Sequence, residues 1–253
     1  NFNTLRIWGG GVFADRTLLD ACDEAGIMVW HDFLFACAQY PLHDPDFLAE
    51  AKREITHAVR TMARHPSLLV WCGNNEIEWN DWSIYSDTNP ARPHYALFHL
   101  DIPRILREED PSKAYWPSSP WSPDFLPPND PSAGDQHPWS VSLQEPGGAD
   151  WLKYREMSDR LPNEGGVLGM SGPATIRRFL AEGERRLLSP AWEHHDNPYA
   201  VMDCEPGVMG HAYQTVRLWT GKDPLAMDWE DYAFASALLQ GEGLAEYIVN
   251  FRR

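Results

Sequence analysis

The sequence predicts an α/β fold in which parallel strands alternate with helices. Short, continuous apolar runs at Ile27–Trp30 and Ser67–Trp71 are typical of strands that a parallel sheet buries on both faces. Longer segments between such runs carry apolar residues at helical spacing. A strand–helix–strand order needs crossover connections, and these connections make neighbouring strands parallel.

The first two strands enclose a helix. Asn3–Trp8 is short and half apolar, and it ends at three consecutive glycines. A helix is expected from about Asp15 to Ala25, because its apolar residues fall on one face. Gly26 stands where a glycine commonly ends a helix in the left-handed conformation. The run Ile27–Trp30 then forms the second strand.

The second helix has the clearest signals. Asp44 can cap it, and Pro45 suits its first turn. Its apolar face continues to Met62, and the helix must end before Pro66, because a residue that precedes proline avoids the helical region. Ser67–Trp71 is the third strand, and it ends in a polar run.

Further elements follow with weaker signals. A proline-rich loop over 117–131 is long enough to be functional, and 189–227 receives no assignment. The remaining expected elements are strands at Tyr115–Trp116, Gln136–Trp139 and Arg160–Glu164, and helices at Pro93–Glu109, Pro173–Leu188 and Asp228–Arg252.

About six strands can therefore be parallel. A closed (β/α)8 TIM barrel needs eight. Since the chain opens on a strand and ends on a helix, we expect a partial barrel that lacks its first and last strands. The expected organisation is a single catalytic barrel domain over residues 1–253. An open, doubly wound sheet is the alternative.

Composition narrows the range of functions. The chain has 253 residues with a net charge of −16, and this acidity disfavours a nucleic-acid partner. No apolar run reaches the 18 residues of a membrane-spanning helix. Four cysteines are too few for a disulfide framework. They do not fix the compartment, which stays unassigned with the cytoplasm slightly favoured. Twelve tryptophans beside polar residues suit a sugar-binding pocket.

Three polar clusters follow the expected strands: Trp30-His31-Asp32, Asn74-Asn75-Glu76 and Asn163-Glu164. In an α/β barrel, catalytic groups lie at the carboxyl ends of strands. Glycoside hydrolysis uses two carboxyl groups, of which one is a protonated acid and the other an ionised nucleophile or base. Glu76 and Glu164 are the candidate pair.

These residues carry a resemblance to glycoside hydrolase family 2, and most of all to its β-mannosidase branch. The stretch from His65 to Glu76 is the longest and most specific match to that family. The resemblance covers most of the chain and is weakest over 190–227. The other matching stretches are Asn3–Gly11, Asp23–Phe33, Tyr115–Trp121, Gly134–His137 and Gln240–Leu244.

The resemblance implies a retaining exo-glycosidase that acts on terminal β-D-mannosides without a metal or organic cofactor. It implies that Glu76 is the general acid/base and that Glu164 is the nucleophile. Asn75 would bind the sugar 2-hydroxyl. The other implied substrate contacts are Trp8 and Asp32 in the terminal-sugar subsite, Arg6 orienting the nucleophile, His137 and Trp139 in the pocket wall, and Trp121 as a further substrate-binding residue.

The sequence departs from the family at two places. Glu164-Gly165-Gly166 stands where the family has Glu, an aromatic residue and Gly, and Pro138 stands where it often has Tyr. The tyrosine hydroxyl that would help to hold the nucleophile is therefore unassigned. The family also implies β-sandwich domains before the barrel and an eighth strand after it, and we expect both in the full-length protein.

Other interpretations remain open. The enzyme could act on a different terminal sugar, as an exo-β-glucosaminidase or a β-galactosidase. A non-enzymatic alternative is an inactive, carbohydrate-binding fragment of such a barrel. A metal site at His194-His195-Asp196 is disfavoured, because adjacent histidine side chains usually diverge.

Overall fold

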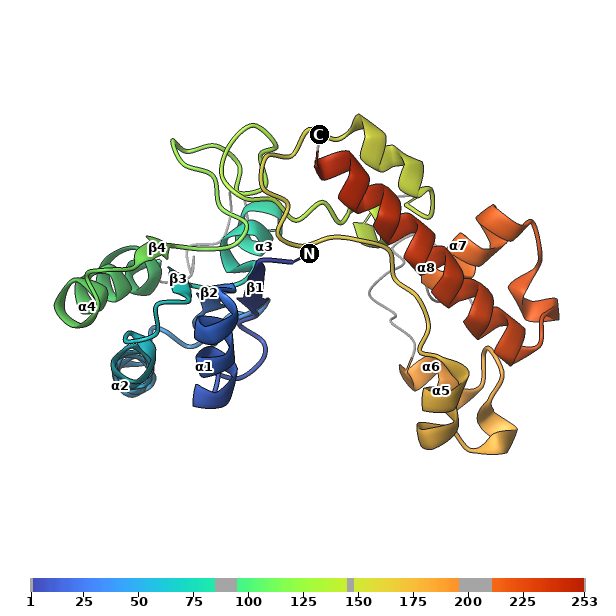
Figure 1. Cartoon of the computed structure of the whole chain (residues 1–253), viewed down its shortest axis with the longest axis horizontal. Coiled ribbons are helices and arrows are strands. Elements are labelled where there is room, and N and C mark those ends of the chain that lie inside the picture. The colour runs from blue at the N-terminus through green and yellow to red at the C-terminus, as the bar shows by residue number, and fades with distance from the viewer. Residues whose placement is uncertain (1, 85–94, 145–147, 196–210, 253) are drawn as a thin grey trace. The chain divides into compact units, whose positions relative to one another are not determined.

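The computed structural model of the chain describes residues 2–84, 95–144, 148–195 and 211–252. The chain divides into two compact units, residues 1–136 and 137–253. The first unit holds a parallel sheet with helices, and the second is mainly helical (Figure 1). A single barrel domain over 1–253 stays a prediction.

The regular elements are as follows. The strands are β1 (Thr4–Ile7), β2 (Met28–Asp32), β3 (Leu68–Cys72) and β4 (Ala114–Trp116). The α-helices are α1 (Arg16–Ala25), α2 (Pro45–Met62), α3 (Ile77–Ile84), α4 (Ile102–Glu109), α5 (Pro173–Phe179), α6 (Pro190–His195), α7 (His211–Thr220) and α8 (Trp229–Phe251). Shorter helical segments are Leu97–Asp101, Trp151–Glu156, Glu182–Glu184 and Pro224–Ala226, whereas the backbone of Ser140–Gln144 is non-helical at Val141 and Ser142.

The sheet of the first unit has the order β1-β2-β3-β4, and every pairing is parallel. Arg6 lies opposite Trp30, and Trp30 lies opposite Val70. The carboxyl ends of the strands therefore meet at one edge. The α/β fold with a parallel sheet is confirmed, and closure into a barrel stays a prediction.

Both early helices begin where their capping residues predict, and α1 also ends at its predicted glycine. The Asp15 carboxylate accepts a hydrogen bond from the Leu18 backbone N–H (2.8 Å), and Gly26 ends α1 with φ +66°. The Asp44 carboxylate accepts the backbone N–H groups of Asp46 and Phe47 at the start of α2. These side chains satisfy backbone donors that a helix start leaves unpaired.

Gly26→Ala tests the end of α1. A Cβ at Gly26 would meet nothing within 4 Å, so only its left-handed backbone opposes the change. We expect a loss of about 1 kcal/mol in the free energy of unfolding, measured by urea denaturation. Gly26→Asn should cost less, because asparagine tolerates this conformation. Equal losses for both variants would contradict this account.

Two of the expected strands are absent. The structure describes both Gln136–Trp139 and Arg160–Glu164 throughout, and neither forms a strand; only Gln136 and Pro162 take part in isolated bridges. Each contains a proline, Pro138 or Pro162, which has no N–H to donate to a strand ladder. The prediction of six strands was therefore wrong for these two.

Two expected helices differ from the prediction. In the helix expected over Pro93–Glu109, a π-helical segment precedes α4, and residues 93–94 lie outside the described residues. Pro103 in the first turn of α4 removes a donor from the regular ladder. The helix expected over Pro173–Leu188 ends at Phe179, because Leu180 is extended (φ −105°, ψ 129°).

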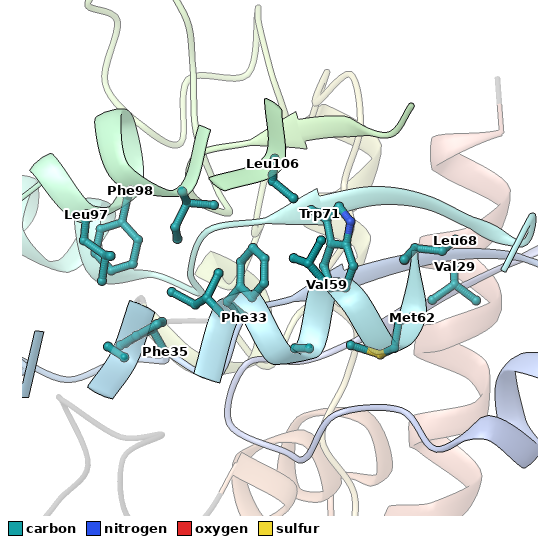
Figure 2. Packing of buried hydrophobic residues seen from close by; sticks show 14 of the residues in the cluster. Val29, Phe33, Phe35, Val59, Met62, Leu68, Trp71, Leu97, Phe98 and Leu106 are labelled. Atoms are coloured by element: carbon teal, nitrogen blue, oxygen red, sulfur yellow. The ribbon is translucent and has the colours of Figure 1, made fainter. Parts of the chain in front are cut away.

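The core of the first unit lies between the sheet and its helices. Figure 2 shows Val59 and Met62 of α2 beside Trp71 and Leu68 of β3. Phe33, which follows β2, stacks on Trp71 with ring centroids 5.0 Å apart. All five residues are at most 2% exposed, so this packing fixes the strand ends that carry the polar clusters.

A histidine–glutamate pair ties α3 to the segment before α4. His99 Nε2 lies 2.6 Å from Glu78 Oε1. This hydrogen bond raises the pKa of His99, and partial burial opposes the rise. A raised folded-state pKa stabilises the fold fully below the unfolded value of about 6.5. That contribution is lost as the pH rises through the folded pKa.

Glu78→Gln should therefore lower the pKa of His99 and remove the stability gained at acidic pH. NMR titration of the His99 ring measures the first effect, and urea denaturation across the same pH range measures the second. Glu54→Gln changes an exposed glutamate of α2 and should alter neither. An unchanged His99 titration in Glu78→Gln would contradict the assignment.

The second unit packs around the long helix α8. Tyr232 and Ala233 of α8 are buried in a cluster with Ile176 of α5 and Trp192 of α6. Near the other end of α8, Trp151 stacks on Trp219 with ring centroids 3.9 Å apart.

In the part of the chain that the structure describes, no helix has the length and apolar character needed to cross a membrane.

Candidate active site

The predicted site residues of the first unit gather at the carboxyl edge of the sheet. Arg6 lies in β1, Asp32 ends β2, and Asn75 and Glu76 follow β3. The parallel register that aligns the strand ends brings these four side chains together. The structure thus places this part of the predicted set in one cluster.

Asp32 is the centre of this cluster. It is fully buried, and it accepts hydrogen bonds from Arg6 Nη2 (2.7 Å) and Arg6 Nε (3.3 Å). It also accepts Trp30 Nε1 (2.9 Å) and the Gly9 backbone N–H (3.1 Å). An ionised carboxylate offers about four lone-pair positions, so Asp32 is fully engaged in orienting Arg6 and Trp30.

A chain of polar contacts links Arg6 to Glu76. Arg6 Nη2 donates to Asn75 Oδ1 (2.7 Å), and Asn75 Nδ2 donates to Cys37 Sγ (3.2 Å). The Cys37 thiol in turn donates to Glu76 Oε2 (3.4 Å). The amide of Asn75 is thereby oriented by a cation on one side and a sulfur on the other.

The backbone at Glu76 is unusual. Its φ of +61° lies in the left-handed region, which few residues other than glycine adopt. The Glu76 N–H donates to the Ser119 carbonyl (2.7 Å). Asn74 Oδ1 accepts the Ile77 N–H (3.1 Å) and so caps α3. Such backbone conformations concentrate at functional sites, and here one turns Glu76 between β3 and α3.

His31 belongs to the fold rather than to the site. Its Nε2 accepts the Ala14 backbone N–H (3.0 Å), while Nδ1 donates to the Asp32 carbonyl (2.7 Å). Burial lowers the pKa of His31, and the carbonyl and the charge of Asp32 oppose this shift. The ring is therefore a neutral tautomer that already uses both nitrogens.

Aromatic rings line the same region of the first unit. Trp116 packs edge-on against Trp121 (4.9 Å) and lies 6.4 Å from Trp30. Buried Asp135 holds this group, since it accepts Trp116 Nε1 (2.7 Å) and the Trp121 N–H (2.8 Å). Trp8 is 44% exposed. Flat, half-buried rings of this kind suit the apolar faces of a sugar.

The predicted site residues of the second unit form a separate cluster around Glu164. Glu164 Oε2 accepts Trp139 Nε1 (3.1 Å) and lies 3.4 Å from His137 Nδ1. The Trp139 N–H donates to the His137 carbonyl (2.8 Å), which closes a three-residue turn around Pro138. Proline presets the backbone angle that such a turn needs. Pro138 therefore shapes the turn that places both partners on Glu164.

The sequence analysis did not identify several residues that support the candidate site. Cys37 contacts Glu76, Asp135 holds the tryptophans, and Tyr247 donates its hydroxyl to the Glu164 backbone carbonyl (3.0 Å). No motif marks them, because each is brought to its partner by tertiary structure.

His194 and His195 lie edge-to-face (5.0 Å), and Asp196 lies outside the described residues.

Comparisons with known proteins agree on one class of enzyme. Beta-mannosidase B of Neosartorya fischeri is 36% identical over 94% of this chain, and that of Aspergillus clavatus is 37% identical over the same share. A crystal structure of β-D-mannosidase from Dictyoglomus thermophilum matches 99% of the chain with a TM-score of 0.83 and 31% identity.

The chain is similar to the β-mannosidases. It spans 28% of the length of the two curated β-mannosidases and 29% of the Dictyoglomus enzyme. No family model matches the chain. The similarity supports the β-mannosidase-like relationship, while the roles of individual residues stay predictions.

Proposed function

We propose that this chain is part of the catalytic region of a retaining glycoside hydrolase of family 2 that releases terminal β-D-mannosyl residues. The observation that carries the proposal is the chain's similarity to β-mannosidases over nearly its whole length. Glu76 and Glu164 are each held by partners of the kind that a functional carboxyl group needs. The predictions for Arg6, Trp8, Asn75 and Trp121 belong to the same proposal.

The proposed chemistry proceeds in two displacements. In the first, a Glu164 oxygen bonds to the anomeric carbon, the bond to the aglycone oxygen breaks, and Glu76 gives its proton to that oxygen. In the second, Glu76 takes a proton from water, the water oxygen bonds to the anomeric carbon, and the ester to Glu164 breaks. Each displacement inverts the anomeric centre, so the released mannose keeps the β configuration.

The local contacts suit these roles. Trp139 Nε1 donates to the Glu164 carboxylate (3.1 Å), and this contact orients the oxygen pair that a nucleophile must present. Asn75, held by Arg6 and Cys37, is preorganised to donate to a sugar 2-hydroxyl. A contact of this kind strengthens in an oxocarbenium-like transition state.

A panel of aryl glycosides tests the proposal. The full-length protein that contains this chain would be assayed on the nitrophenyl β-mannoside, β-glucosaminide, β-galactoside and β-glucuronide. We expect the highest kcat/KM on the mannoside, and proton NMR during turnover should detect β-mannose first. Preference for another sugar would reassign the specificity, and α-mannose as first product would exclude retention. Sugar binding without turnover of any glycoside would favour a carbohydrate-binding fragment.

A further inference from the structure

We propose that Tyr247 and Tyr154 form a clamp that positions Glu164. The clamp consists of these two side chains and the backbone of residues 162–166 that they hold. The inference rests on the proposed function, because it assumes that Glu164 reacts, and it adds two positioning residues to that function. All of its members lie in the second unit.

Tyr247 holds the residue itself. From α8, its hydroxyl donates to the Glu164 carbonyl (3.0 Å) and lies 3.3 Å from the Pro162 carbonyl. These contacts join residues 83 and 85 positions apart in the chain. They fix the main chain on both sides of Asn163, one residue before the carboxyl group that must be aimed.

The Tyr247 ring also fills the space beside Gly165. A Cβ at Gly165 would come within 2.8 Å of Cε2 of that ring, and the φ of Gly165 is +132°. A side chain at position 165 thus has neither a favourable backbone angle nor room. The aromatic ring that packs after Glu164 is supplied from α8, which accounts for the glycine at a position where a side chain was expected.

Tyr154 holds the other end of the segment. Its hydroxyl accepts the Gly166 N–H (2.9 Å) and donates to the Gly166 carbonyl (2.8 Å). The two phenol rings pack edge-to-face with centroids 5.0 Å apart. The two hydroxyl groups therefore hold the backbone at Glu164 and at Gly166.

The hydroxyl groups of Tyr154 and Tyr247 remain hydrogen-bond donors over the pH range in which enzymes usually work. Burial raises the pKa of Tyr154 to about 12 and raises that of Tyr247 further. Neither phenol ionises near neutral pH, so the hydroxyl protons are available to the carbonyl groups throughout.

Trapping of the nucleophile tests the clamp in the full-length protein. 2-Deoxy-2-fluoro-β-D-mannosyl fluoride bonds its anomeric carbon to Glu164 and loses fluoride, and mass spectrometry locates the label. We expect Tyr247→Phe to slow labelling about tenfold, because misplacing a reacting group is costly. Tyr213→Phe is the matched control, since it removes a phenol hydroxyl that binds Asp223 (3.3 Å) in the same unit.

The outcomes separate the clamp from the proposed function. Slower labelling of Tyr247→Phe with a Tm equal to that of Tyr213→Phe supports the clamp, and labelling at the wild-type rate overturns it. If Tyr247→Phe lowers the Tm more than Tyr213→Phe does, the same comparison is made with Tyr154→Phe. Slower labelling of that variant supports the clamp, and labelling at the wild-type rate overturns it. Failure of the wild-type protein to label Glu164 overturns the proposed function alone.

A second measurement does not depend on activity. In a double-mutant cycle, Gly165→Ala should shift the urea midpoint less in a Tyr247→Ala background than in wild type, because the ring that meets the new Cβ is gone. Equal shifts in the two backgrounds would overturn the proposed packing of Tyr247 on Gly165, whatever reaction the protein performs.

Discussion

Replacing either candidate carboxyl group should nearly abolish hydrolysis, but with opposite stereochemical consequences in the presence of azide. Glu164→Ala removes the proposed nucleophile, so turnover of an aryl β-mannoside should fall at least ~10⁴-fold. Glu76→Ala removes the proposed acid/base and should lower turnover by about 10² to 10⁴-fold. The loss should be smallest with leaving groups that need no proton.

Azide distinguishes the two roles. In Glu76→Ala the mannosyl enzyme still forms from a substrate with a good leaving group, and azide attacks it without needing a general base. Two inversions then give β-mannosyl azide. In Glu164→Ala azide attacks the substrate directly from the vacated side, and a single inversion gives α-mannosyl azide. The anomer of the product, read by NMR, assigns each glutamate.

Exposed glutamates supply the controls for this experiment. Glu54→Ala in the first unit and Glu156→Ala in the second remove carboxyl groups at exposed positions. Both should keep wild-type turnover. The assignment would be contradicted by the α-azide from Glu76→Ala, or by full activity in either site variant.

The parallel sheet could be predicted because its signals are local. Apolar runs and the capping residues Asp15, Gly26 and Asp44 each act within a few residues of the boundary they set. The same locality misled the prediction around Pro138 and Pro162. There, polar residues near a tryptophan or a glutamate resembled strand ends, yet a proline without an N–H interrupts each segment and neither forms a strand.

The candidate site was predicted in its motifs but not in its supports. Asn75 and Glu76 follow a buried strand, so their place at the sheet edge could be inferred from the sequence. The contact of Cys37 with Glu76 could not, since it depends on left-handed backbone at both residues. Tyr247 is similarly invisible, because a tyrosine on a long helix has no feature that marks its distant partner.

Removing Asp32 should be among the most destabilising single changes in the first unit. Its carboxylate is fully buried and neutralises Arg6, whose side chain is only 12% exposed. Asp32→Ala would remove this ion pair from a largely buried guanidinium. Breaking one partner of a buried ion pair costs about 3–5 kcal/mol, and the free Trp30 and Gly9 donors would add to the loss.

Urea denaturation followed by tryptophan fluorescence would measure the effect, with two comparisons that separate charge from cavity. Asp44→Ala removes an exposed capping carboxylate and should cost about 1 kcal/mol. The double variant Arg6→Met/Asp32→Leu removes both charges and should be more stable than Asp32→Ala, because neither half of the buried ion pair remains. If the double variant were the less stable of the two, the loss would arise from packing rather than from the uncompensated charge. The position of the Arg6 side chain beside Asn75 would then not require the charge of Asp32.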